Sequence, residues 1–417
     1  MKSLVPTGRD YVLTRSAIGK DVVAGFTVAI VALPLALGFG ITSGMSAAAG
    51  LTTAIIAGFL AALFGGSRFQ VSGPTGAMTV VLIPIIHSYG VGAIPLLGIL
   101  AGAMVILMAL FKLGKIINQV PWAVVEGFTV GIACVIALQQ LPLALGVAKG
   151  SGDRSLPIAL HTIQDALAGA INWKSLLIVA ITLAVKFSYP KISKRLGIKV
   201  HIPASFVAIV VALLVTKLFG FDIANIGDIP RSVGGLNLSG ISMDMVTNLL
   251  WPAFLIALLC AIESLLSARV ADGMAHTDKE DLYHPNRELF GQGLGTAVAS
   301  IFGGMPATGA IARTSVNVRS HAQTRLASII HSFVLLFVVL VAAPVVSAIP
   351  SAAIAGVLIG TSYRILNPAS IRESLQTTKA EAIVLITTAL STLIIDLIWG
   401  IAIGIALHFV LRKTKLS

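Results

Sequence analysis

The sequence predicts an all-α polytopic membrane protein, with about fourteen transmembrane segments arranged as two inverted seven-segment repeats. Its composition is the first indication, because 56% of the 417 residues are hydrophobic, 11% are charged and the mean hydropathy is +0.96. Apolar runs of about 20 residues, the length of a membrane-spanning helix, recur along the chain. In addition, two glycine-rich stretches in different halves share one pattern, Phe-Gly-Gly followed by Pro and Thr-Gly-Ala.

The first predicted repeat covers residues 21–221 and follows a basic lead over residues 1–20. Pro34 lies inside its first apolar run, where a proline removes a backbone hydrogen bond and kinks the helix. A short amphipathic helix is predicted at 156–167. The spans are predicted at 21–40, 47–64, 92–111, 121–141, 173–189 and 203–219, with a broken segment in third place.

The second half repeats this arrangement after a polar, glycine-rich linker, predicted over residues 222–247. Residues 248–417 form the predicted second repeat, and its third segment is again broken. The uninterrupted spans are predicted at 248–270, 289–302, 326–346, 352–366, 380–395 and 397–411. Because seven is an odd number, the two repeats are expected to enter the membrane in opposite orientations.

The formal net charge of +12 does not indicate a nucleic-acid partner, because of how the basic residues are distributed. They cluster in the first 20 residues, after the fourth and sixth spans and at the C-terminal end, while the intervening loops are poorer in Lys and Arg. That alternation is the positive-inside pattern. It predicts that both termini are cytoplasmic and that the partner is a lipid bilayer, a plasma membrane of the bacterial inner-membrane type.

The sequence contains no motif of an enzyme or a primary pump, since a Walker loop, a dinucleotide fingerprint and a nucleophile elbow are all missing. Cys134 and Cys260 both lie inside apolar runs, so a disulfide framework is not indicated. We therefore expect a protein that is not an enzyme, with no cofactor and no bound metal.

The two glycine-rich stretches, 64–78 and 302–314, are typical of broken membrane helices, in which a half-helix begins near the midplane of the bilayer. The amino end of a half-helix has free N–H groups and a positive dipole, so its natural ligand is an anion. We expect Thr75-Gly76 and Gly309-Ala310 to expose such N–H groups. The alternative is that both stretches are turns at packed helix ends.

Two ionisable residues in apolar surroundings are candidates for the site, because a charge inside a membrane needs a partner or a function. Glu263 lies in the middle of the eighth span, and Arg313 lies just after the second broken segment. A guanidinium matches the geometry of carboxylate, sulfate or bicarbonate. The alternatives are a cytoplasmic anchor for Arg313 and a structural ion-pair partner for Glu263.

Together, several short motifs resemble the SulP (sulfate permease) family of anion transporters. The motifs are 33–34 (LP) with Phe39, 65–68 (GGSR), 72–75 (SGPT), 261–267 (AIESLLS), 271–274 (ADGM), 286–293 (NRELFGQG) and 307–314 (ATGAIART). The resemblance covers essentially the whole chain, as the family's membrane domain without its C-terminal STAS domain. It implies that a core domain moves against a gate domain, with the anion held between the third and tenth segments.

The resemblance also assigns residues. Phe39, Thr75 and Gly76 are implied for the anion pocket, as are Gly309, Ala310, Ile311, Ala312 and Arg313 around the amino end of the tenth segment. Glu263, with Ser267 in the same motif, matches the position used for cation coupling. Sodium-coupled bicarbonate members tend to have Asp there, so Glu favours a proton over sodium.

We therefore expect a secondary active transporter that carries a small anion together with a proton, by alternating access, as a homodimer. A dicarboxylate such as fumarate is the favoured substrate, followed by bicarbonate and sulfate. One alternative is a nucleobase permease of the same architecture, although Arg313 argues against a neutral substrate. The other is an anion channel or a membrane scaffold that transports nothing.

Overall fold

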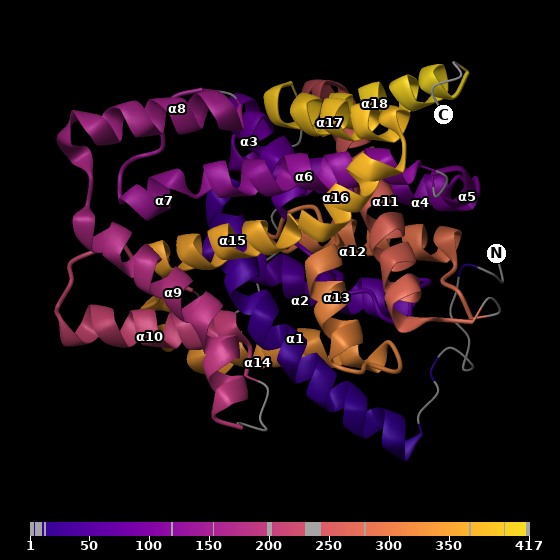
Figure 1. The fold of residues 1–417 in the computed structure, drawn as a ribbon. Helices are drawn as coiled ribbons and strands as arrows, with labels where there is room; N and C mark the ends of the chain where they lie inside the picture. The colour runs from indigo at the N-terminus through magenta and orange to yellow at the C-terminus, as the bar shows by residue number, and fades with distance from the viewer. Residues whose placement is uncertain are drawn as a thin grey trace. The chain divides into compact units, whose positions relative to one another are not determined.

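The fold was analysed in a computed structural model (Figure 1), which describes residues 4, 11, 14–117, 120–152, 154–197, 202–229, 243–278, 281–366, 368–395 and 397–413. In the first half the helices are α1 (Arg15–Thr42), α2 (Ala47–Phe64), α3 (Gly76–Tyr89), η2 (Val91–Ala93), α4 (Ile94–Leu110), α5 (Gly114–Ile117), α6 (Trp122–Gln139), α7 (Leu141–Leu145), α8 (Ser155–Asp165), η3 (Ala166–Ala170), α9 (Trp173–Arg195) and α10 (Ala204–Leu218). In the second half they are α11 (Met243–Ala275), α12 (Pro285–Ile301), α13 (Ile311–Arg319), α14 (Leu326–Ser347), α15 (Ser351–Ile365), α16 (Pro368–Thr377), α17 (Lys379–Ile394) and α18 (Leu397–Lys413). Two short strands, β1 (Ser72–Gly73) and β2 (Thr308–Gly309), complete the described elements.

The predicted polytopic membrane architecture is confirmed, since each predicted segment coincides with a helix or with a strand followed by a helix. Among the described residues, seven helical stretches are long and apolar enough to cross a membrane: α1, α2, Val91–Leu110, Trp122–Leu145, α9, α11 and α14. Helix α16 was not predicted, because its ten residues are mostly polar and carry no span signal. Pro34 lies inside α1, as expected.

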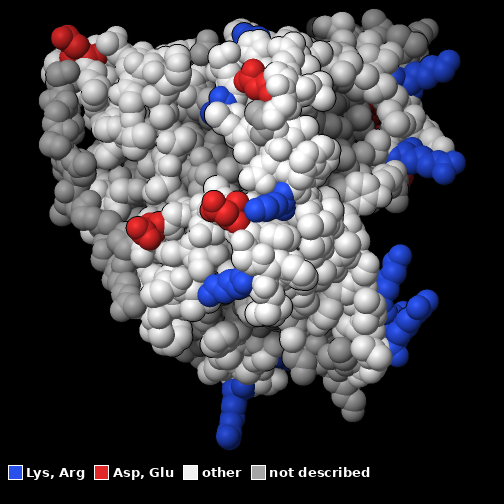
Figure 2. Space-filling model, turned by 90° about the vertical axis from the view of Figure 1, so that its left-hand side faces the viewer, with Lys and Arg blue, Asp and Glu red and all other residues white. Residues whose placement is uncertain are grey.

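The charge distribution of the surface can be followed on one face of the molecule (Figure 2). Most of the described side chains on this face are neither acidic nor basic, and the charged ones are scattered with both signs among them. This face therefore has no continuous basic surface within the described residues, in agreement with the sequence argument against a nucleic-acid partner.

The chain folds into two compact units, and each unit takes segments from both halves of the sequence. The first contains Met1–Asn118, Lys199–Phe206 and Asn225–Ile349, and the second contains Gln119–Ile198, Val207–Ala224 and Pro350–Ser417. These units divide the chain in a different way from the predicted repeats at 21–221 and 248–417. Residues 230–242 of the predicted linker and most of the predicted lead lie outside the described residues.

The second unit contains a buried lysine that joins two of its helices. Lys186 on α9 is 1% exposed, and its Nζ donates to the carbonyl of Val357 at 2.6 Å and to Oγ1 of Thr361 at 2.7 Å, both on α15. A buried ammonium has to be hydrogen-bonded in this way, because leaving it unpaired away from water is costly. The two hydrogen bonds therefore connect α9 to α15, which also pack against each other.

The first unit is built from closely packed helices, among which α1, α2 and α14 lie side by side (Figure 1). Helices α4 and α12 pack closely against each other through glycines. A Cβ atom added to Gly102 of α4 would lie 2.5 Å from the carbonyl oxygen of Gly293 on α12. Without side chains at these two positions, the two backbones can touch.

Replacing Gly102 with valine should destabilise the first unit. The added side chain would meet backbone atoms of Gly293 and Ala297, which cannot move aside as a flexible side chain would. We expect a loss of about 1–3 kcal/mol, as for other overpacked cores, seen as a lower unfolding temperature in detergent. Gly92→Val is the control, because a Cβ at Gly92 meets nothing within 4 Å. Equal stability of the two variants would contradict the prediction.

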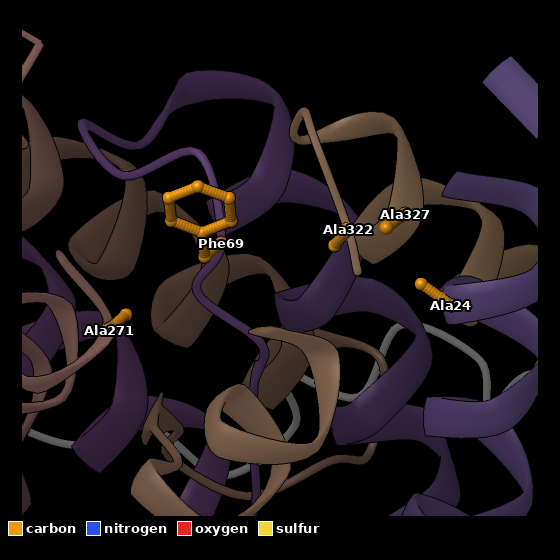
Figure 3. Close-up of a cluster of buried hydrophobic side chains, with 5 residues drawn as sticks. All are labelled: Ala24, Phe69, Ala271, Ala322 and Ala327. Atoms are coloured by element: carbon orange, nitrogen blue, oxygen red, sulfur yellow. The ribbon is translucent and has the colours of Figure 1, made fainter. Parts of the chain in front are cut away.

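The segment that connects α2 to β1 is anchored by an aromatic side chain. Phe69 is 8% exposed and packs in a cluster of alanines from α1, α11, α14 and the loop before α14, namely Ala24, Ala271, Ala327 and Ala322 (Figure 3). The small alanine side chains leave room for one large ring, so the ring fixes the position of the chain three residues before β1.

Candidate functional site

The candidate site lies in the first unit, where the two broken segments meet. Strand β1 pairs with β2 in antiparallel orientation, with Ser72 opposite Gly309 and Gly73 opposite Thr308. Helix α3 begins at Gly76, just after β1, and helix α13 begins at Ile311, just after β2. The prediction of two broken helices that meet is confirmed, and the alternative of two turns at packed helix ends is wrong.

The amino ends of the two half-helices differ in how they are capped. Oγ1 of Thr75 accepts a hydrogen bond from the backbone N–H of Met78 at 3.3 Å, which caps α3. Ala310 precedes α13 and has no side chain that can do the same. The first N–H groups of a helix have no acceptor within the helix, so the start of α13 is a stronger donor site for an anion than the start of α3.

The expectation that Gly309 and Ala310 expose their N–H groups is not met. The N–H of Gly309 donates to Oγ of Ser264 at 3.0 Å, and the N–H of Ala310 donates to the carbonyl of Val71 at 2.9 Å. Strand pairing and α11 therefore use both donors, and the first N–H groups left without a helical acceptor belong to Ile311 and Ala312. A side chain added to Gly309 would collide with the amide of Gln70.

Glu263 contacts both broken segments at once. It lies on α11, is 8% exposed, and its Oε2 accepts hydrogen bonds from Oγ1 of Thr75 at 3.0 Å and from Oγ1 of Thr308 at 2.7 Å. Thr308 was not identified from the sequence, although its place in the Thr-Gly-Ala motif gave a signal. The hydrogen-bond partners of Glu263 are hydroxyls, and it forms no direct ion pair with any of the described residues.

Arg313 is buried inside the first unit and is not an anchor at the membrane surface. It is 1% exposed, and its Nη2 donates to the carbonyl of Pro74 at 2.8 Å. Its Nη1 is buried and has no hydrogen-bond partner among the described residues. The guanidinium lies beside Gly73, so its charge is placed against the backbone just before Thr75. The cytoplasmic-anchor alternative is therefore wrong.

Phe39 and Ser267 also touch the broken segments, but neither contacts the Glu263 carboxylate in the described hydrogen bonds. Phe39 of α1 is 7% exposed, and its carbonyl accepts from Oγ1 of Thr79 on α3 at 3.4 Å. Oγ of Ser267 on α11 donates to Oγ1 of Thr314 at 3.1 Å. Thr314 in turn accepts from the N–H of Val71 at 3.0 Å, so Ser267 helps to join α11 to both segments.

A second buried carboxylate holds the chain that leads into β1. Glu288 on α12 is 1% exposed and accepts from the N–H groups of Gly66 at 2.8 Å and Ser67 at 2.9 Å. It also accepts from the amides of Gln70 at 2.6 Å and Gln292 at 3.0 Å, and the Gln292 amide further contacts Oγ of Ser72 in β1. The sequence showed the motif around Glu288 but not this role, because three of its four donors, in Gly66, Ser67 and Gln70, are about 220 residues away.

Replacing Glu288 with alanine should destabilise the fold strongly, because four buried donors would lose their shared acceptor. Hydrogen bonds to a charged group contribute about 1.5–3 kcal/mol each, so we expect the variant to unfold at a much lower temperature in detergent. Asp281→Ala is the matched control on the same part of the fold, since its 2.5 Å ion pair with Arg68 is half exposed. Such surface pairs contribute about 0–1 kcal/mol. Similar unfolding temperatures for both variants would contradict the prediction.

Comparison with known proteins identifies the family. The model of the sulfate permease family matches residues 18–388. The chain is 36% identical over 403 residues to the protein named "Putative sulfate transporter YvdB" of Bacillus subtilis (strain 168), which covers 95% of this chain and 74% of that protein. It is 32% identical over 417 residues to the bicarbonate transporter BicA of Picosynechococcus, which covers 95% of this chain and 70% of that protein.

Solved structures agree with these sequence matches. The transmembrane domain of a cyanobacterial bicarbonate transporter BicA superimposes with a TM-score of 0.83 at 30% identity, covering 93% of this chain and 98% of that one. The anion transporter Slc26a9 of mouse, in its inward-facing state, shares the fold with a TM-score of 0.85 at 16% identity, covering 99% of this chain and 71% of that one. The family consists of transporters and not of enzymes. This multi-pass membrane protein belongs to the sulfate permease family.

Proposed function

We propose that this protein is a secondary active transporter of small oxyanions that works by alternating access. The observation that carries the proposal is the start of α13, where N–H groups without a capping side chain lie at the crossing of the two broken segments. Such a helix end attracts anions through its free donors and its dipole. The names of the relatives, a bicarbonate and a sulfate transporter, support the same class of substrate.

The anion site in this proposal is formed by the ends of both half-helices and by the residues next to them. Arg313 supplies a full positive charge next to Gly73 of β1, and its Nη1 has no partner among the described residues. The proposed site residues are Phe39, Thr75, Gly76, Gly309, Ala310, Ile311, Ala312 and Arg313. Gly309 acts in it through close packing and not through its N–H, which Ser264 already accepts.

We also propose that a proton travels with the anion and that Glu263 carries it. A permanently ionised carboxylate at 8% exposure within an apolar span is costly, and it would repel an incoming anion. Protonation removes both penalties, so proton and anion should bind together and leave together. By linkage, the anion raises the affinity for the proton by the same factor as the proton raises the affinity for the anion.

Uptake into proteoliposomes tests the proposal directly. Labelled fumarate, bicarbonate, sulfate and uracil would be offered in sodium-free buffer, with and without an inward proton gradient, and then with a sodium gradient. We expect saturable, proton-stimulated uptake of one of the three oxyanions, with fumarate as the favoured substrate. Uptake of uracil would instead indicate a nucleobase permease. Uptake that does not saturate would indicate a channel, and no uptake of any compound would contradict a transport function.

The proposal extends to the assembly and the topology of the protein. We propose a homodimer with both chain termini in the cytoplasm, from the resemblance to the family and from the distribution of Lys and Arg. Labelling single cysteines near each terminus with a membrane-impermeant reagent in intact cells tests the topology, and no labelling is expected. The mass of the protein in lipid nanodiscs tests the dimer.

A further inference from the structure

Three side-chain oxygens from three different elements form a closed triangle beside the candidate anion site. Oε2 of Glu263 lies 3.0 Å from Oγ1 of Thr75 and 2.7 Å from Oγ1 of Thr308, and the two hydroxyl oxygens are 3.2 Å apart. Thr75 precedes α3, Thr308 lies in β2 and Glu263 lies on α11. All three are buried, at 8%, 0% and 8% exposure respectively. The carboxylate is thus in contact with one hydroxyl from each broken segment.

The number of hydrogens in the triangle depends on the protonation of Glu263. Each hydroxyl has one hydrogen to donate, while an ionised carboxylate can only accept. With Glu263 ionised, Thr75 and Thr308 can both donate to Oε2, and the contact between the two hydroxyls then contains no hydrogen. With Glu263 protonated on Oε2, the acid must itself donate, so at least one hydroxyl has to turn away from it.

The distances favour one arrangement of the protonated state. The acid hydrogen goes to Oγ1 of Thr308, its nearest neighbour at 2.7 Å, and Thr308 then donates to Oγ1 of Thr75 at 3.2 Å. Oγ1 of Thr75 also accepts from the N–H of Met78. Both of its acceptor positions are then filled, and its own hydrogen is free to point to a new acceptor.

We propose that Thr308 is a positioning residue that transmits the binding of a proton at Glu263 to Thr75, so that Thr75 can donate to the bound anion. The proposal rests on the proton-coupled transport proposed above. A hydronium ion of the solvent supplies the proton, so its O–H bond breaks to leave water and one O–H bond forms at Glu263. No other covalent bond changes, because the two hydroxyl hydrogens only exchange their acceptors. Release of the proton restores both donations to Oε2 and withdraws the Thr75 hydrogen from the anion.

Among the charged and titratable groups on the elements around Glu263, the Glu263 carboxylate is the one whose protonation can rearrange the hydrogen bonds of the triangle. Arg313 on α13 attracts it electrostatically, and the thiol of Cys260 on α11 donates to the carbonyl of Ala307 at 3.2 Å. Glu288 on α12 is occupied by its own donors. Helix α4 and strand β2 contain no titratable residue. The titratable residues of α3 are His87 and Tyr89, at the end of the helix away from Thr75, and the titratable residue of α5 is Lys115.

Removing the Thr308 hydroxyl while keeping its shape tests the inference. The apparent affinity for the transported anion would be measured in exchange assays between pH 5.5 and 8. The wild type should bind more tightly at acidic pH. Thr308→Val should lose most of this acid stimulation, roughly three- to tenfold in affinity at the acidic end, the value of one hydrogen bond. Thr308→Ser keeps the hydroxyl and should restore the wild-type pH profile.

Thr296→Val is the matched control for disturbance of the backbone. Oγ1 of Thr296 contacts both the carbonyl of Ala307 at 3.0 Å and its N–H at 3.3 Å, next to Thr308 but outside the triangle. This variant should lower activity at all pH values and leave the acid stimulation intact. Thr308→Ala would replace Thr308→Val if the latter does not insert into the membrane.

The possible results separate the two proposals. Full acid stimulation in the Thr308→Val or Thr308→Ala variant would overturn the proposed role of Thr308 but not the proton coupling. Loss of stimulation that Thr308→Ser does not restore would also overturn it, since the hydroxyl would then not be the cause. Absence of acid stimulation in the wild type would overturn the proton coupling itself.

Discussion

Replacing Glu263 with glutamine should leave a protein that exchanges anions but no longer accumulates them in response to a pH gradient. The amide resembles the protonated acid, so it does not repel the anion and can still pair with Thr75 and Thr308. It cannot release a proton, however. If one proton accompanies each anion and the coupling is neutral in charge, a gradient of one pH unit supports up to about tenfold accumulation. The variant should reach a ratio of about one.

The measurement compares equilibrium exchange with gradient-driven uptake in the same proteoliposomes, in sodium-free buffer. Exchange shows that the variant is folded and binds the anion, so a loss of accumulation alone can be attributed to coupling. If Glu263→Gln still concentrates the anion when the gradient is imposed, the proton is carried elsewhere. The next residue to test would then be Glu126, a buried carboxylate on α6 of the second unit.

Much of this fold can be predicted from the sequence because the bilayer imposes its own length scale. A span needs about 20 apolar residues, and runs of that length are visible without any tertiary information. The broken segments are also visible, because Phe-Gly-Gly and Thr-Gly-Ala occur in each half at corresponding positions. Glu263 was identified because it lies within an apolar span, and Thr75 because it lies in a broken segment. The structure brings these two residues into contact.

The parts that could not be predicted depend on contacts between distant segments. Thr308 and Glu288 look like ordinary members of their motifs until β2 and α12 are placed against α11 and the chain before β1. The use of the Gly309 N–H by Ser264 is of the same kind, since nothing near Gly309 in sequence indicates which helix lies beside it. The interleaving of both halves in each compact unit is likewise a tertiary property.

The charge of Arg313 has no complete counter-charge among the described residues. The side chain is 1% exposed, and one of its nitrogens has no acceptor among the described residues. Its described hydrogen bond goes to the neutral carbonyl of Pro74 at 2.8 Å. A buried charge is costly without a counter-charge. Glu263 attracts it, but protonation of that carboxylate would remove this attraction at the moment when the anion is expected to bind.

Arg313→Ala should therefore weaken anion binding by about ten- to a hundredfold, corresponding to about 1.5–3 kcal/mol for a contact that involves a charged group. Arg313→Lys should recover most of the affinity. The wild-type guanidinium donates one N–H to Pro74 and lies beside β1, so we expect the position of the charge to matter more than the planar fork.

Arg319→Ala, at the exposed end of the same helix, is the control and should bind as the wild type does. Affinity is measured by competition in exchange assays, and thermal unfolding in detergent shows whether each variant is folded. Wild-type affinity in a folded Arg313→Ala variant would show that the guanidinium serves only packing, and a lysine variant as weak as the alanine variant would show that the fork is required.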